Sequence, residues 1–257
     1  MGLILNMNDI TLRLTAEARK NWRPELPNVR PKNASTLIIV EKKDDDENRV
    51  LMGRRHMNHK FMPGLYVFPG GRLDRSDYYV KSAAGFNEVT RNKVLFDMKG
   101  GPSNRRANAL AMAAIRETYE EAGIFLGTKS TSVTASSHSD WAAFKQRNIV
   151  PDLSKVYFLA RAITPPHRTR RFDTRFFVAF SDAIADQLPQ GHGPTDELQD
   201  LHWLTIAQTQ DLKLPAITKV ILQHLDECLK KSPDLSHNTP APYFRWRNDM
   251  MQGEFIE

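Results

Sequence analysis

The chain has very little cysteine and no long apolar segment. Cys228 is the one cysteine among 257 residues, so an intrachain disulfide is excluded and we expect a reducing compartment. No apolar stretch approaches the roughly 18 residues that a membrane span needs, and the apolar run at the N-terminus is too short for a secretory signal. Internal repeats and low-complexity segments are also lacking. These absences predict a cytoplasmic protein with no membrane partner.

The composition fits one elaborated globular domain. Hydrophobic residues make up 40% of the chain, which is enough for a sizeable core. The 36 basic and 30 acidic residues give a net charge of +6, which suits an enzyme that accepts phosphorylated substrates. The same charge would suit RNA, so charge alone does not choose between a nucleotide and a nucleic acid.

The order of the expected elements predicts an α/β fold. β-branched and aromatic residues predict strands at 35–41, 50–54, 65–68, 156–163, 175–180 and 201–204. Amphipathic periodicity with capping residues predicts helices at 103–122, 139–146 and 216–230. A mixed β-sheet with helices on both faces follows from this order.

Three segments differ in character along the chain. Residues 1–33 are polar and interrupted by prolines, and we expect an irregular leader with a short helix near 16–22. Residues 34–230 contain the expected sheet and helices and form the main domain. Residues 231–257 are expected to be a loop-like tail with a short aromatic segment at 243–246.

The helix expected to end near residue 122 carries three closely spaced carboxylates. Glu117, Glu120 and Glu121 stand at i, i+3 and i+4, which places them on one side of the helix. Their mutual repulsion does not stabilise a helix that is purely structural. A divalent cation would remove the repulsion, and Mg²⁺ or Mn²⁺ prefers such oxygen ligands. The opposite side is apolar, with Ala111, Met112, Ile115, Tyr119 and Ala122. The alternative is a solvated acidic face in which Arg116 pairs with Glu120.

Together with an upstream motif, this helix resembles the Nudix box. Residues 116–123 read R-E-x-x-E-E-x-G, and residues 68–71 read F-P-G-G, similar to the first half of the box. An ordinary box has 13 residues between its opening glycine and its arginine, whereas 44 separate Gly71 from Arg116. The resemblance therefore implies an insertion of 31 residues, at about 73–103. The family's intermediate glutamate, counted back from the arginine, falls on Asn108.

The resemblance implies a Nudix α/β/α sandwich over about residues 34–230 and a metal-dependent hydrolysis of a phosphoanhydride. The implied ligands of Mg²⁺ or Mn²⁺ are Glu117, Glu120, Glu121 and the carbonyl of Gly70. Arg116 is implied to orient Glu117 or Glu120. A loop after the box supplies a base in many Nudix enzymes, and Glu197 is our candidate, with Asp196 second; a surface acid is the alternative.

The segment before F-P-G-G is similar to that of Nudix coenzyme A diphosphatases, matched here by Arg55, Lys60 and Gly64. The peroxisomal-type acyl-CoA diphosphatases and their bacterial relatives are the branch that fits best. They imply coenzyme A or acyl-CoA as substrate, cleaved to 3′,5′-ADP and (acyl) 4′-phosphopantetheine. We expect Arg54, Arg55 and Lys60 to hold the 3′-phosphate. Simple solvation of this loop is the alternative.

A second basic group lies at residues 167–171, within which Arg171 is a further substrate-binding candidate. Neighbouring aromatic residues would also suit RNA, but one of Phe176 and Phe177 must face the core, which disfavours nucleic acid. ADP-ribose or NADH is the runner-up substrate. A catalytically inactive Nudix-fold regulator, suggested by Asn108, is the alternative of another class.

The insertion is expected to be partly helical and to need a surface for its apolar residues, Val80, Ala84, Val89, Val94 and Leu95. Both halves of the box must meet at one site, so the insertion would emerge at the rim of that site. A lid over the substrate is the favoured expectation, and a homodimer interface is the alternative.

Overall fold

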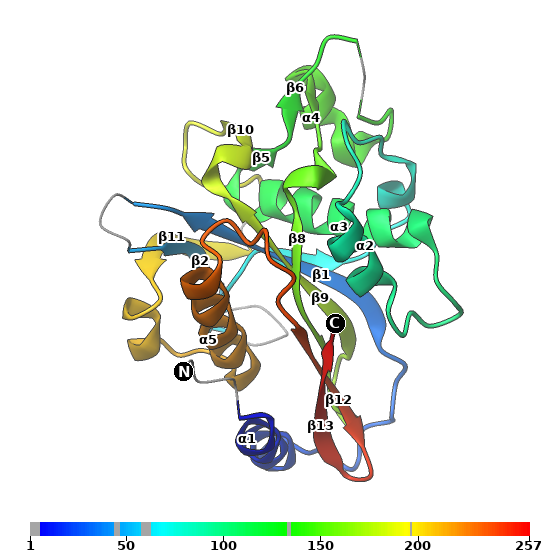
Figure 1. The fold of residues 1–257 in the computed structure, drawn as a ribbon, viewed down its shortest axis with the longest axis vertical. Helices are drawn as coiled ribbons and strands as arrows, with labels where there is room; N and C mark the ends of the chain where they lie inside the picture. Colours follow the sequence, from blue (N-terminus) through cyan, green and yellow to red (C-terminus); the bar gives the residue numbers. More distant parts are fainter. Residues whose placement is uncertain (1–5, 44–46, 58–62, 133–134, 196) are drawn as a thin grey trace.

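The computed structural model describes residues 6–43, 47–57, 63–132, 135–195 and 197–257. A large mixed sheet runs through the centre of the molecule (Figure 1), with the strand order β11-β2-β1-β9-β8-β12-β13. Short strand β3 pairs with β2, and β4 pairs with β1. The pairs β1–β9 and β8–β12 are parallel, and the other pairs are antiparallel. Its strands are β1 (Lys32–Glu41), β2 (Arg49–Arg55), β3 (Tyr66–Val67), β4 (Gly70–Arg72), β8 (Tyr157–Ile163), β9 (Phe172–Phe180), β11 (Leu198–Thr205), β12 (Ala241–Arg247) and β13 (Met250–Ile256).

Helices cover both faces of this sheet, as Figure 1 shows. In β1, Leu37 and Ile39 join the core that contains α3 (Asn104–Ala122), whereas Ile38 and Val40 join the core that contains α5 (Ala216–Lys231). The alternation follows from the two-residue period of a strand, and a strand buried on both faces is apolar throughout. The expected α/β fold with a mixed sheet is confirmed.

The helix that carries the acidic motif has the predicted ends. The Ser103 hydroxyl accepts a hydrogen bond from the Arg106 N–H at 3.3 Å and caps the N-terminus of α3. Gly123 ends the helix in the left-handed conformation at φ 72°, which glycine adopts without strain. Smaller elements lie at one end of the molecule, namely α4 (Ala142–Gln146), β5 (Ile124–Leu126) paired with β10 (Ile184–Gln187), and β6 (Thr128–Lys129) paired with β7 (Ile149–Val150).

The expectation of an irregular leader is wrong. Residues Met7–Lys20 form α1, capped by the side chain of Asn6. Ile10 and Leu14 lie one turn apart and pack against Val220, Phe244 and Met251. This stripe anchors the helix, which begins well before the expected short helix at 16–22. The domain boundary at residue 34 stays a prediction.

The C-terminal residues are strands of the central sheet, so the expected loop-like tail is wrong. Strand β12 lies parallel to β8 and continues into β13 through the two-residue turn of Asn248 and Asp249. Both turn residues have positive φ, at 49° and 57°, as a tight hairpin turn requires. Phe244 is fully buried. The pairing of β12 with β8 joins segments about 80 positions apart, which a local pattern does not show.

The insertion packs on the body of the protein. It contains the 3₁₀ turn η1 (Ser76–Tyr79) and α2 (Glu88–Leu95). Phe86, Val94 and Met98 are buried in the core that includes α3. Arg161 of β8 donates to the carbonyls of Phe96 and Asp97 at 3.0 and 3.1 Å. The insertion therefore covers α3 and β8, and the expected lid is wrong: none of its described residues beyond Asp74 lines the large cavity described below.

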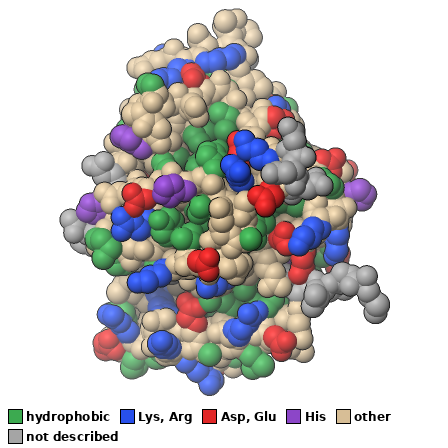
Figure 2. Space-filling model, turned by 90° about the vertical axis from the view of Figure 1, so that its left-hand side faces the viewer, with side chains coloured by type: hydrophobic (Ala, Val, Ile, Leu, Met, Phe, Trp, Pro, Cys, Tyr) green, Lys and Arg blue, Asp and Glu red, His purple; other side chains and the backbone are tan. Residues whose placement is uncertain are grey.

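The described residues include no helix long and apolar enough to cross a membrane. On the face drawn in Figure 2, the described Lys and Arg side chains are interspersed with Asp and Glu side chains. This face therefore lacks the continuous basic surface, among its described residues, that a polynucleotide would require. The cytoplasmic location and the homodimer stay predictions.

Candidate active site

Arg116 holds the acidic end of α3 in place through four charged hydrogen bonds. Its Nε and Nη2 atoms donate to the two carboxylate oxygens of Asp77 at 2.9 and 3.1 Å. Its Nη1 atom donates to Glu117 Oε1 and to Glu120 Oε2, both at 2.9 Å. Arg116 is 3% exposed and Asp77 is 1% exposed. Buried bonds of this kind set the side-chain positions of Glu117 and Glu120, as the sequence predicted for Arg116.

Asp77 is a site residue that the sequence analysis missed. The intermediate carboxylate of the box lies eight positions before the arginine in an uninterrupted box, and hence six after the opening glycine. Counting forward from Gly71 gives Asp77, whereas counting back from Arg116 gives Asn108. Since Asp77 is the residue that contacts Arg116, the extra residues follow the carboxylate. The sequence therefore contained this residue at the expected spacing, and counting forward from Gly71 would have identified it.

Strand β4 brings the F-P-G-G motif against the acids of α3. The Gly70 N–H donates to Glu121 Oε2 at 2.9 Å. A Cβ atom on Gly71 would lie 2.3 Å from the carboxyl carbon of Glu117, so a larger residue there would displace the Glu117 carboxylate. The structure therefore brings Glu117, Glu120, Glu121 and Gly70 together, as the sequence predicted. The carbonyl of Gly70 as a metal ligand stays a prediction.

Burial and mutual repulsion raise the pKa of every carboxylate in this group. Burial is the main cause for Glu117, whose pKa rises to about 7 despite the neighbouring Arg116. Burial, then the charge of Glu117, raises the pKa of Glu121 well above its ordinary value. Burial also raises the pKa of Glu120. Desolvated carboxylates of this kind are costly without a compensating cation.

The residues present fit a divalent cation. Glu121 Oε1 is buried and has no hydrogen-bond partner among the described residues, which leaves one carboxylate oxygen available as a ligand. The described His, Cys, Asp and Glu side chains do not form a group of three around one cation position. Arg116 Nη1 bonds one oxygen of Glu117 and one of Glu120. The donor set fits Mg²⁺ or Mn²⁺, and the metal site itself is a proposal.

The loop before β11 closes over the C-terminal end of α3. The Thr195 N–H and hydroxyl both donate to the carbonyl of Glu120, at 3.0 and 2.7 Å, and the Gly193 N–H donates to the carbonyl of Glu121 at 3.2 Å. These bonds place Glu197 at the same cavity as Glu117. The charge of Glu197 contributes to the raised pKa of Glu117 and of Glu121. Asp196 lies outside the described residues.

Comparison with known structures agrees with this geometry. The crystal structure of a Nudix hydrolase from Alicyclobacillus acidocaldarius superposes on the chain with a TM-score of 0.61 and 23% sequence identity. The match covers 81% of this chain and 97% of that one. The chain has the Nudix fold.

Sequence comparison points to the same group. The chain is 28% identical over 185 residues to nudix hydrolase 7 of Caenorhabditis elegans, a match that covers 67% of this chain and 51% of that protein. It is 25% identical over 189 residues to the acyl-coenzyme A diphosphatase NUDT19 of Xenopus laevis, covering 56% of this chain and 50% of that protein. The chain thus spans about half the length of these curated relatives. No protein-family model matches the chain.

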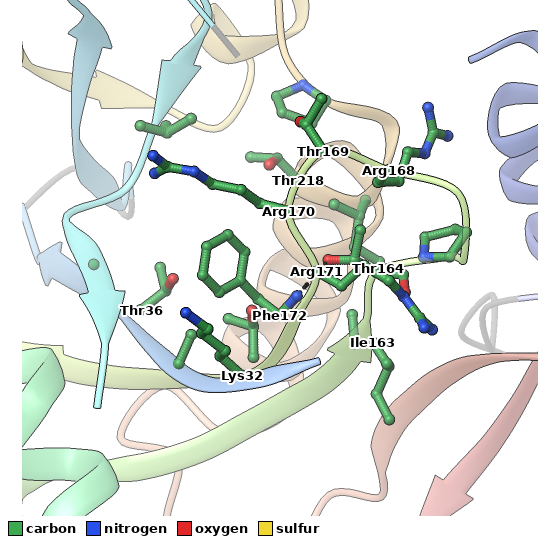
Figure 3. Close-up of a pocket in the computed structure, with 18 of the residues that line it drawn as sticks. Lys32, Thr36, Ile163, Thr164, Arg168, Thr169, Arg170, Arg171, Phe172 and Thr218 are labelled. Carbon is green, nitrogen blue, oxygen red and sulfur yellow. Dashed lines mark hydrogen bonds between the residues drawn. The ribbon is translucent and has the colours of Figure 1, made fainter. Parts of the chain in front are cut away.

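A cavity of about 1280 Å³ extends from the Nudix acids across one face of the sheet. Glu117, Gly70, Gly71, Arg55 and Glu197 line its acidic end. The remaining walls come from the leader, the first turn of α5 and the loop between β8 and β9, part of which Figure 3 shows. The leader therefore forms part of the cavity, which the sequence analysis did not predict.

The four predicted substrate-binding residues differ in their positions and contacts. Arg55 lines the cavity. Arg54 instead donates to Asp200 Oδ2 through Nε and Nη2, at 2.8 and 2.5 Å. Arg171 lines the cavity, but its guanidinium donates to the carbonyls of Thr164 and Val29 at 3.0 and 2.9 Å. Lys60 lies outside the described residues.

Proposed function

We propose that this chain is a metal-dependent Nudix pyrophosphohydrolase that cleaves a phosphoanhydride in a nucleoside diphosphate derivative. The observation that carries the proposal is the cluster of Glu117, Glu120 and Glu121 on one side of α3: Glu117 lines the large cavity, and Glu121 is buried and bonded to the Gly70 N–H. The similarity to Nudix hydrolases in sequence and in fold supports it.

Each residue of the group has a defined task in this proposal. Glu117, Glu120, Glu121 and the carbonyl of Gly70 would hold Mg²⁺ or Mn²⁺, and Nudix hydrolases generally use divalent metal ions. Such a cation supplies charge neutralisation at the bridging phosphates and a water of lowered pKa. Arg116 keeps the carboxylates oriented through its own bonds to Asp77. The Glu197 carboxylate accepts the proton of the attacking water.

Coenzyme A or acyl-CoA is the substrate that we propose within this class, giving 3′,5′-ADP and (acyl) 4′-phosphopantetheine. One sequence relative is named an acyl-coenzyme A diphosphatase. The cavity volume of about 1280 Å³ exceeds the range of about 300–1000 Å³ that is typical of small-molecule sites, as a long substrate requires. ADP-ribose or NADH is the runner-up, because either contains the same scissile group.

The position of Asp77 removes the one observation that favoured an inactive Nudix-fold regulator. That alternative depended on Asn108 in place of the intermediate carboxylate. A carboxylate is present at the equivalent count from Gly71, and it is buried against Arg116. Arg116 and the glutamates of α3 are therefore as complete as an active box requires.

A substrate panel tests the proposal. The protein is incubated with coenzyme A, an acyl-CoA, ADP-ribose and NADH, with Mg²⁺, with Mn²⁺ and with a chelator, and products are identified by mass. The expected result is metal-dependent release of 3′,5′-ADP from coenzyme A or acyl-CoA. Turnover of ADP-ribose or NADH alone would overturn the choice of substrate. Nucleotide binding by calorimetry with no product from any compound would overturn the enzyme assignment in favour of the regulator.

A further inference from the structure

The floor of the cavity is one face of the β1–β9 strand pair. Lys32 lies opposite Phe172 in the parallel register, and Thr36 lies opposite Phe176. Adjacent residues of a parallel pair point to the same face, so Lys32, Phe172 and Thr36 share it. Thr36 is also opposite Gly70 in the register of β1 with β4. Lys32 and the glycine beside the proposed metal site therefore lie along the same face of β1, with Thr36 opposite that glycine.

Four basic residues stand at the far end of this face, and two of them are used to attach the leader. Arg168 donates to the carbonyls of Asn21 and Ala18, the second at 3.1 Å. Arg171 donates to the carbonyl of Val29 at 2.9 Å. The ring of Trp22 lies 4.5 Å from that of His167, centroid to centroid, and strengthens the same attachment. These contacts give Arg168 and Arg171 a structural role, so neither arginine requires a bound ligand to explain its presence in the loop.

Arg170 and Lys32 differ from these neighbours. Both line the cavity, and within the described part of the chain neither side chain makes a hydrogen bond or an ion pair. In Figure 3, the side chains of Arg170, Phe172 and Lys32 extend to the same side of the cavity, with the Phe172 ring drawn between the two cations and the Lys32 amine on the side of Thr36. Both side chains are exposed to solvent, which weakens their mutual repulsion, and an anion bound by both would remove it. Their position predicts an anionic ligand group there.

We propose that Arg170 and Lys32 form a subsite for a second phosphate on the nucleoside half of the substrate, separate from the phosphoanhydride held at the acidic end. The inference builds on the proposed function and identifies what its specificity depends on. Lys32 and Thr36 are four positions apart along β1, a distance of about 13 Å. A 3′-phosphate on the ribose, as in coenzyme A, fits this position.

Arg55 is too close to the acids to serve as this subsite. Arg55 is paired with Leu198 in the register of β2 with β11, next in the chain to Glu197, which places it at the acidic end of the cavity. Arg54 is bonded to Asp200. The 3′-phosphate assigned to these residues from the sequence is therefore better placed on Arg170 and Lys32, and Arg55 is left to contact the phosphoanhydride.

Ligand binding without catalysis tests the subsite. Calorimetry compares adenosine 3′,5′-bisphosphate with adenosine 5′-monophosphate, using the wild type, Arg170→Gln, Lys32→Gln and the exposed control Arg91→Gln. The wild type should prefer the bisphosphate by about 10- to 100-fold, and each subsite variant should remove most of that preference. Arg91→Gln should retain it. Equal wild-type affinities, or a preference that survives both subsite substitutions together, would overturn the inference.

A kinetic comparison separates this inference from the proposed function. The ratio of kcat/KM for coenzyme A over dephospho-coenzyme A should fall toward one in Arg170→Gln and should stay at the wild-type value in Arg91→Gln. A wild type that cleaves both compounds equally would reject the subsite and keep the hydrolase. A wild type that cleaves neither but prefers the bisphosphate would reject the hydrolase and keep the subsite.

Discussion

Asp77 and Arg116 are 39 positions apart in the chain, yet two hydrogen bonds of 2.9 and 3.1 Å join their side chains inside the protein. The parallel geometry matches the planar guanidinium to the carboxylate. The pair links the start of the insertion to the helix that carries the glutamates of the proposed metal site. Any change in Asp77 should therefore reach Glu117 and Glu120 through Arg116.

Asp77→Asn should reduce turnover while the protein stays folded. The amide cannot accept both bonds from the guanidinium, so Arg116 loses its orientation. We expect turnover to fall by about 10- to 100-fold and the free energy of unfolding to fall by about 1–3 kcal/mol. Asp74→Asn is the matched control, because Asp74 is 44% exposed and its carboxylate lies 4.0 Å from Arg116 Nη2. Equal effects of the two substitutions would show that Asp77 has no special role.

Gly71→Ala should inactivate the enzyme by displacing Glu117. The added Cβ would lie 2.3 Å from the Glu117 carboxyl carbon, so that side chain must move. A shift of about 1 Å at a catalytic group costs roughly 100-fold in rate, and we expect at least that loss in kcat. Gly85→Ala, within the insertion, meets no atom within 4 Å and should leave kcat unchanged. Normal kcat in Gly71→Ala would place Glu117 outside the catalytic group.

Phe244→Ala should destabilise the whole domain, because the C-terminal hairpin belongs to the central sheet. Phe244 is fully buried beside Ile10 and Val220. Removing its ring should lower the free energy of unfolding by about 3–5 kcal/mol in urea titrations. Phe96→Ala is the comparison, since Phe96 is 43% exposed and should cost under about 1 kcal/mol. A small effect at Phe244 would mean that the hairpin contributes little to the fold.

His224 should make the protein less stable in mild acid. Burial, followed by the charges of Lys93 and Lys231, lowers the pKa of His224 from 6.5 to about 4. The unfolded chain therefore takes up a proton at a higher pH than the folded chain. The free energy of unfolding should fall as the pH drops from about 6.5 to about 4, by about 3 kcal/mol in total from this group.

Urea unfolding of the wild type and of His224→Gln across this pH range measures that contribution. The glutamates of α3 also titrate in this pH range. The informative quantity is therefore the difference in the free energy of unfolding between the two proteins. The wild type should lose more stability than the variant. Parallel curves would show that His224 does not titrate between the folded and unfolded states as its burial requires.

Local patterns were sufficient for the elements that carry the site. Helix α3 has the predicted ends because Ser103 and Gly123 act through nearest-neighbour geometry. Strand β1 was visible because burial on both faces leaves a continuous apolar run. The glutamates and Arg116 could be recognised because their spacing lies within one helix. The F-P-G-G motif could be recognised because its four residues are contiguous, whatever the length of the insertion that follows.

The features that sequence analysis missed depend on contacts between distant segments. The pairing of β12 with β8 and the packing of α1 on α5 and β13 come from residues far apart in the chain. The use of Arg171 to attach the leader, in place of a ligand, is likewise decided by the carbonyl of Val29. Asp77 is different, since the count from Gly71 would have found it.

The most direct test of the central claim is the paired measurement of turnover and thermal stability in Glu121→Gln. Glu121 is 1% exposed, and its raised pKa shows that the buried charge is unfavourable without a cation. With Mg²⁺ and coenzyme A, we predict a loss of turnover of roughly 10³-fold, with a Tm equal to or above that of the wild type in chelator. Glu227→Gln, on α5, should match the wild type in both. Undiminished turnover in Glu121→Gln would contradict the assignment of this carboxylate group as the catalytic centre.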